Sequence, residues 1–149
     1  MVIVETFFKI NDKFIKANEY LDPLPDDDAH IDGAITLIVN DKTVLTFQHW
    51  DYVVLMWGFI IDGLSKNNLK EETVIGFPDQ PSDLKFVPTL NNRVIIHLNG
   101  TNITSVDRCE LLQALVNEAR FFFNKLISLK PEKSEKFNKD LNIIDHIKI

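Results

Sequence analysis

The sequence has little cysteine and little glycine, and these two scarcities exclude several kinds of site. Among 149 residues there is one cysteine, Cys109, and there are five glycines. A single thiol forms neither an internal disulfide nor a cysteine-based zinc cluster. The few glycines form no glycine-rich loop that could cradle a phosphate group. We therefore expect no metal and no cofactor.

Sequence motifs of common enzymes are also missing. The chain has no GxGxxG, GxxxxGK[ST], GxSxG or HExxH pattern. Its four histidines are scattered without a spacing typical of metal ligands, and Cys109 has no cysteine-enzyme signature around it. These absences favour a protein that is not an enzyme.

Long hydrophobic runs are absent as well. The longest apolar stretch without a charge, Tyr52–Ile61, has ten residues, whereas a bilayer-spanning helix needs about 20. Glu5, Lys9 and Asp12 interrupt the apolar N-terminal segment, which argues against a signal peptide. We expect no membrane association and a cytoplasmic location.

Positive charge is scarce in the first part of the chain. The net charge is −6 overall, and residues 1–90 carry 7 Lys or Arg against 15 Asp or Glu, a net of −8. Nucleic-acid-binding proteins usually show a basic surface, so we expect no nucleic-acid partner. An acidic segment is compatible with a basic protein partner.

What the chain does contain is ordinary for a globular protein. It is 45% apolar and 26% charged, and its eleven Phe residues provide large apolar side chains for a core. We find no internal repeat and no linker. The sequence predicts a single domain over residues 1–149.

Alternating apolar residues and turn-forming residues predict an α+β fold with a mainly antiparallel sheet. Residues 2–10 alternate as a half-buried strand, and two hairpins turn at 40–42 and at Asn91-Asn92. With a short strand at 73–77, the sheet would have about five or six strands. Pro88 lacks an N–H, so its strand should lie at an edge or end near it. Residues 11–21 fit either a short helix capped by Asn11 or a hairpin turning at Asn11-Asp12.

Three helices are predicted to pack on this sheet. The first, at about 49–65, is apolar except for one stripe formed by Asp51, Gly58, Asp62 and Ser65. The second, at about 107–130, is long and amphipathic, with Asp107 as a candidate N-cap residue. A short C-terminal helix follows at about 131–141, and the apolar tail should dock on the body.

An acidic loop is the first candidate functional site. Asp26, Asp27, Asp28 and Asp32 lie in a proline-containing segment. A calcium loop is excluded because Val39 stands where a bidentate Glu is needed. The four carboxylates then form either a solvated loop or a contact surface for a basic partner.

Aromatic residues around the first helix form the second candidate site. Trp50, Tyr52 and Trp57 fit three interpretations: core packing, an interface cluster, or the lining of a ligand pocket. Trp50 and Trp57 are seven residues apart, which would place them on one side of a helix.

Together these features predict a non-catalytic, small acidic protein that acts by binding another protein. The concrete hypothesis is an immunity- or antitoxin-like protein that neutralises a basic partner. One alternative is a small-ligand-binding module or enzyme with a pocket near Trp50, Tyr52 and Trp57. Another is a structural homodimer or subunit whose apolar helix forms the contact.

Overall fold

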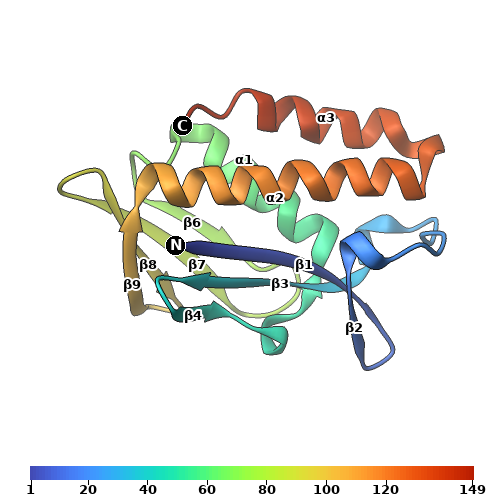
Figure 1. Ribbon diagram of the computed structural model, residues 1–149, viewed down its shortest axis with the longest axis horizontal. Coiled ribbons are helices and arrows are strands. Elements are labelled where there is room, and N and C mark those ends of the chain that lie inside the picture. Colours follow the sequence, from blue (N-terminus) through green and yellow to red (C-terminus); the bar gives the residue numbers. More distant parts are fainter.

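The computed structural model describes residues 1–149 and has an α+β fold, as the sequence predicts (Figure 1). Its helices are α1 (Val53–Asn67), α2 (Arg108–Leu129) and α3 (Ser134–Asp145). Its strands are β1 (Val2–Ile10), β2 (Lys13–Lys16), β3 (Asp32–Val39), β4 (Lys42–Leu45), β5 (Asp51–Tyr52), β6 (Thr73–Gly76), β7 (Asp83–Thr89), β8 (Arg93–Leu98) and β9 (Thr101–Asp107). Four 3₁₀ turns complete the structure: η1 (Ala17–Glu19), η2 (Asp28–His30), η3 (Phe47–His49) and η4 (Pro131–Lys133).

The strands form two antiparallel sheets where the sequence pattern suggested one. The first sheet has the order β2-β1-β3-β4, with β5 also paired to β3, and the second has the order β6-β7-β8-β9. All strand pairs in both sheets are antiparallel. The predicted count of five or six strands was too low because β2 and β5 are short and β9 (TNITSVD) has few apolar residues.

Asparagine-rich turns set the register of the hairpins, as predicted. Asn40 and Asp41 both have positive φ values and connect the paired residues Val39 and Lys42, as in a two-residue type I′ turn. Asn91 and Asn92 also have positive φ values, in a three-residue loop between the paired residues Thr89 and Arg93. Asn11 also has a positive φ (56°), and β1 pairs with β2 around it. Residues 11–12 therefore form a hairpin turn and not a helix cap.

Pro88 lies near the end of β7, as its missing N–H predicts. On one side β7 pairs with β8 through Pro88 and Thr89, but on the other side its pairing with β6 stops at Phe86. The proline therefore sits where β7 has only one neighbouring strand.

The apolar helix begins four residues later than predicted. Thr46 is the N-cap residue of η3 and forms a capping box with His49. In this capping box, His49 Nδ1 accepts a hydrogen bond from the Thr46 N–H at 2.9 Å. Asp51 and Tyr52 then pair with β3 as β5, and α1 starts at Val53. Asp51 is therefore absent from the polar stripe of the helix, which keeps Gly58, Asp62 and Ser65.

The long helix α2 begins where its cap residue predicts. The Asp107 carboxylate accepts a hydrogen bond from the Glu110 N–H at 2.9 Å, which satisfies one of the free donors of the first turn. The C-terminal helix α3 starts at Ser134, after η4, and ends four residues beyond the predicted end. The tail docks as expected, since Ile147 is buried and the Lys148 N–H donates to Asn68 Oδ1 at 3.0 Å.

One cluster of 36 buried apolar residues joins both sheets and all three helices. In Figure 1, α2 crosses above β1 and β3, and α3 lies along the outer side of α2. The fully buried side chains at the centre include Trp57, Phe8, Phe86, Phe122 and Phe123. No helix has the length and apolar character needed to cross a membrane.

Candidate functional site

The predicted acidic loop is divided, because two of its four carboxylates, those of Asp26 and Asp28, form ion pairs with lysines of this chain. Asp28 is only 1% exposed, and its carboxylate accepts hydrogen bonds from Lys133 Nζ at 3.0 Å and Lys136 Nζ at 2.5 Å. Burial works to raise the pKa of Asp28, but the hydrogen bonds from these two lysines outweigh burial, and its pKa is lowered. Asp28 is therefore a structural ion-pair partner, and the prediction that it lies on an exposed contact surface was wrong.

Asp26 also forms an ion pair with a lysine, but its side chain lies at the surface. Its carboxylate contacts Lys130 Nζ at 2.7 Å, and the side chain of Lys130 is itself nearly buried and donates to the Leu24 carbonyl at 3.2 Å. The hydrogen bond and the charge of Lys130 hold the pKa of Asp26 below its usual value. We call Asp26, Asp28, Lys130, Lys133 and Lys136 the aspartate–lysine cluster. It joins the acidic loop to the segment that links α2 to α3 and to the first turn of α3.

Asp27 and Asp32 are placed differently, on the side of the loop that faces β5. Asp27 is exposed and contacts His30 Nδ1 at 2.6 Å. The His30 ring stands edge-on to the ring of Tyr52, with centroids 5.0 Å apart and an interplanar angle of 89°. Asp32 pairs with Tyr52 across the β3–β5 ladder. Tyr52, predicted as part of the aromatic site, therefore lies next to Asp27 and Asp32, predicted as part of the acidic loop.

A further carboxylate, Asp79, completes this arrangement. Its charge is the largest cause that raises the pKa of Tyr52, followed by burial and by the charges of Asp32, Asp51 and Asp27. Each of these carboxylates disfavours the phenolate form by like-charge repulsion. We call the exposed and half-exposed residues Asp27, His30, Asp32, Tyr52 and Asp79 the Tyr52 patch.

The buried carboxylate of Asp51 holds Asp79 in position. Asp51 is 4% exposed, and its two oxygens accept hydrogen bonds from the backbone N–H groups of Asp79 and Gln80 at 3.0–3.1 Å. It also accepts from the N–H of Tyr52 at 2.6 Å. One side chain therefore fixes both Tyr52 and the turn that carries Asp79. The sequence analysis missed this role, although a lone Asp before an apolar run was the available signal.

The three predicted aromatic residues do not line a common pocket. Trp57 is fully buried, and its Nε1–H donates to Thr6 Oγ1 at 3.0 Å. Trp50 lies before α1, is 37% exposed, and has Lys9 Nζ 4.4 Å from its ring centroid. The prediction that Trp50 and Trp57 project from one side of a helix was wrong, because the helix starts after Trp50.

The cavity beside this segment is too small for a ligand. It measures about 10 Å³ and is lined by residues that include His49, Asp51, Val53, Met56 and Phe77. A space of that size holds at most one water molecule. Burial lowers the pKa of His49 and outweighs the opposing hydrogen bond from the Thr46 backbone. His49 is therefore favoured in its neutral form, consistent with its role as a cap acceptor.

No group of three or more His, Cys, Asp or Glu side chains is arranged to hold a metal ion. The Tyr52 patch is thus an acidic surface with an aromatic side chain, supported from below by Asp51. Comparisons with protein-family models, with curated proteins and with solved structures give no match to this chain.

Proposed function

We propose that this chain is a non-catalytic binding protein that docks a basic protein partner on the Tyr52 patch. In its specific form, the proposal is an immunity- or antitoxin-like protein that neutralises its partner by covering a basic site. The observation that carries the proposal is the arrangement of carboxylates around Tyr52, which pairs with Asp32 across the β3–β5 ladder and whose backbone N–H shares the Asp51 carboxylate with the N–H of Asp79.

The chemistry of the Tyr52 patch suits a cationic partner. Tyrosine is favoured at interface hot spots because it offers a large amphipathic surface. Asp32 and Asp79 form no ion pair with any lysine or arginine of the chain, and Asp27 pairs only with His30. An approaching Arg or Lys could therefore satisfy them without breaking an existing salt bridge.

The patch is also held in place before binding. The Asp51 carboxylate accepts hydrogen bonds from the backbone of Tyr52, Asp79 and Gln80. The ion pairs of the aspartate–lysine cluster hold the loop that carries Asp27. A surface that does not need to be ordered loses less entropy on association. Complementary charge would in addition accelerate the encounter, with a rate that falls as salt increases.

The proposal predicts that a basic protein is retained by the wild-type chain and lost when the patch is changed. The purified protein, immobilised, is exposed to a lysate of the organism that produces it, and bound proteins are identified by mass spectrometry. The patch variant is Asp32→Asn combined with Asp79→Asn and Tyr52→Ala. We expect a partner with a basic surface to bind the wild type and to lose about a hundredfold or more in affinity with this variant.

A matched control removes the same charge elsewhere. Glu71→Gln combined with Glu132→Gln changes two exposed carboxylates that form no ion pair, and this variant should bind like the wild type. Equal binding by the patch variant would place the contact on another surface. Recovery of a small molecule and no protein would contradict the proposal and favour a ligand-binding function.

A further inference from the structure

The outer edge of β1 has unpaired backbone groups near its N-terminal end. β1 pairs with β3 from Val2 to Phe8, but β2 covers its other edge only from Phe7 to Ile10. Residues 2–6 therefore have a neighbouring strand on one side only. An exposed strand edge of this kind can pair with another extended chain.

The pairing pattern identifies which residues face this open edge. The Asn40 N–H donates to the Met1 carbonyl at 2.8 Å, so Met1 bonds toward β3, and the odd-numbered residues that follow it do the same. In an antiparallel ladder the intervening residues direct their N–H and C=O groups the other way. Val2, Val4 and Thr6 therefore point away from β3.

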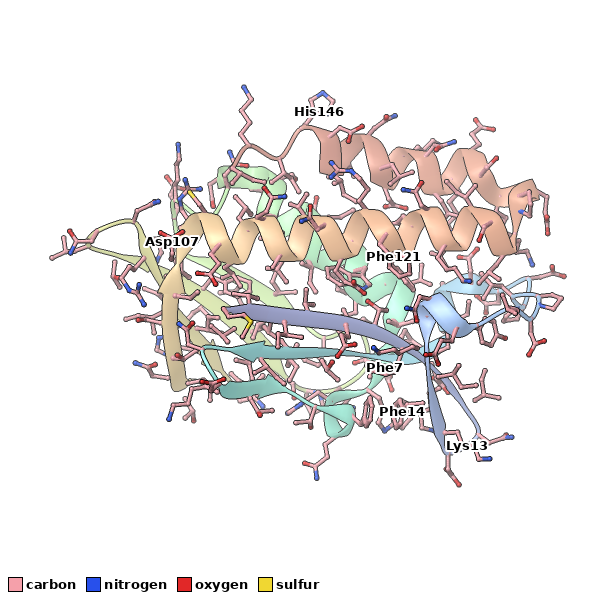
Figure 2. All side chains as sticks on the ribbon, viewed as in Figure 1. Phe7, Lys13, Phe14, Asp107, Phe121 and His146 are labelled. Atoms are coloured by element: carbon pink, nitrogen blue, oxygen red, sulfur yellow. The ribbon has the colours of Figure 1, made fainter.

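An open, shallow depression lies between the free edge of β1 and α2. Its wider part, about 410 Å³, lies between Val2–Val4 of β1 and Ala114, Asn117 and Glu118 of α2. A smaller cavity of about 60 Å³ follows, and its lining residues include Thr6, Lys16, Glu118 and Phe121. Glu118 lines both spaces, and Figure 2 shows Phe121 on the underside of α2, above β1.

The Glu118 carboxyl group lies where the two spaces meet. Its carboxylate accepts a hydrogen bond from Thr6 Oγ1 at 2.7 Å, and the same hydroxyl accepts from buried Trp57. Lys16, in the same cavity, pairs with Glu5 at 2.5 Å, and Glu118 forms no ion pair. Burial and the charge of Glu5 raise the pKa of Glu118 against the opposing bonds from Thr6. A cation placed beside Glu118 would stabilise the ionised form of its carboxyl group.

We propose that the open edge of β1 accepts an extended segment of a partner protein, which pairs with Val2 and Val4 and places a Lys or Arg side chain against Glu118. This inference does not rest on the function proposed for the Tyr52 patch, since the two surfaces share no residue. A second copy of the chain fits less well as the occupant. Its own edge segment, Val2–Thr6 (VIVET), carries a carboxylate and no cation.

The probe for this site is a seven-residue peptide of alternating valine and threonine with lysine at its centre, acetylated and amidated at its ends. Binding is followed by backbone amide shifts of the ¹⁵N-labelled protein. We expect shifts at Val2, Val4, Thr6 and along the facing side of α2. A peptide with glutamine in place of lysine should bind about tenfold more weakly, because it cannot form a charged hydrogen bond with Glu118.

Two pairs of variants separate the roles of charge and backbone. Glu118→Gln keeps an acceptor for Thr6 but removes the charge, so it should abolish the preference for lysine over glutamine. Glu132→Gln, the matched charge control, should not. Val4→Pro removes the outward N–H without removing a bond to β3, and should abolish binding, whereas Val4→Ala should preserve it. The amide spectrum of each variant verifies its fold.

The peptide experiments would overturn the inference in any of three ways: no shift at Val2 and Val4 up to millimolar peptide, equal affinity for the lysine and glutamine peptides, or equal binding by the Val4→Pro and Val4→Ala variants. Self-association of the protein through β1, seen as a concentration-dependent mass, would also contradict it. None of these results bears on the Tyr52 patch, which is tested by different variants.

Discussion

The aspartate–lysine cluster and the Tyr52 patch are neighbouring acidic regions that differ in what faces their carboxylates. In the cluster, Asp26 and Asp28 contact lysines from the far end of the chain. In the Tyr52 patch, Asp32 and Asp79 form no ion pair, and their charges raise the pKa of Tyr52. Consecutive aspartates can therefore serve opposite purposes: Asp28 stabilises the fold, while its neighbour Asp27 remains at the surface.

The aromatic residues of the predicted site divide in the same way. Trp57 is fully buried and donates to Thr6, whereas Tyr52 is half-exposed beside His30. The inward group, Trp57 and Asp28, should govern stability. The outward group, Tyr52, Asp32 and Asp79, should govern recognition. Substitutions in the two groups should therefore differ in their effect on the free energy of unfolding.

The largest effect is expected for the inward tryptophan. Trp57→Ala should lower the free energy of unfolding by about 3–5 kcal/mol, because it leaves a cavity in the core and removes the hydrogen bond that Trp57 donates to Thr6. Tyr52→Phe should change it by less than about 0.5 kcal/mol, as surface substitutions usually do. Urea denaturation of both variants checks the difference, and a comparable loss in the two would remove the distinction between inward and outward residues.

The next effect concerns the buried aspartate. Asp28→Asn should lower the free energy of unfolding by about 1–3 kcal/mol, since an amide cannot replace a carboxylate between two ammonium groups. Asp27→Asn, one residue away, serves as the control and should be close to neutral. Thermal unfolding at neutral pH measures both. Equal melting temperatures for the two variants would mean that the contacts with Lys133 and Lys136 contribute no stability.

The pH dependence of the same pair gives an independent measurement. The pKa of Asp28 is lowered in the folded protein from the ordinary value of 3.8. The folded state therefore gains from the ionised carboxylate at every pH above that value. This gain in stability decreases once the pH falls below about 3.8, the pKa of the unfolded chain, and is lost when the pH has fallen below the lower pKa of the folded protein. The wild type and Asp28→Asn should accordingly converge in stability in acid, whereas a constant difference down to pH 2 would exclude the ion pair as its cause.

The smallest effect is expected at the surface. Asp79→Asn should lower the pKa of Tyr52, because it removes the largest of the charges that raise it. Tyr20→Phe as a background leaves one tyrosine to follow by phenolate absorbance. In that background Glu71→Gln, which removes a charge elsewhere, should leave the titration unchanged. An unchanged titration in Asp79→Asn would show that Asp79 does not face Tyr52.

Local chemistry made much of the fold predictable. Asp107 caps α2 by bonding to the Glu110 N–H, and the Asn40-Asp41 and Asn91-Asn92 turns have positive φ as their residue types require. Asn68, in the left-handed conformation, ends α1. In each case the stabilising contact lies within a few residues, so a short stretch of sequence contains the whole cause.

The features that sequence reasoning missed depend on distant residues. The burial of Asp28 requires Lys133 and Lys136, more than a hundred positions away. The start of the helix predicted at 49–65 was placed too early, because Asp51 pairs with β3 and its carboxylate accepts a hydrogen bond from the Asp79 N–H. The Tyr52 patch escaped detection for the same reason: Asp79 comes from a turn that no local pattern connects to the acidic loop.

The span of the aspartate–lysine cluster has a consequence for the order in which the molecule folds. Asp26 and Lys130 are separated by 104 positions. During synthesis the acidic loop therefore emerges long before the lysines that neutralise it, the last of which, Lys136, lies in α3. Contacts so distant along the chain raise the contact order and slow the folding of a domain. The complete cluster can form only after α2, η4 and the first turn of α3 have been synthesised.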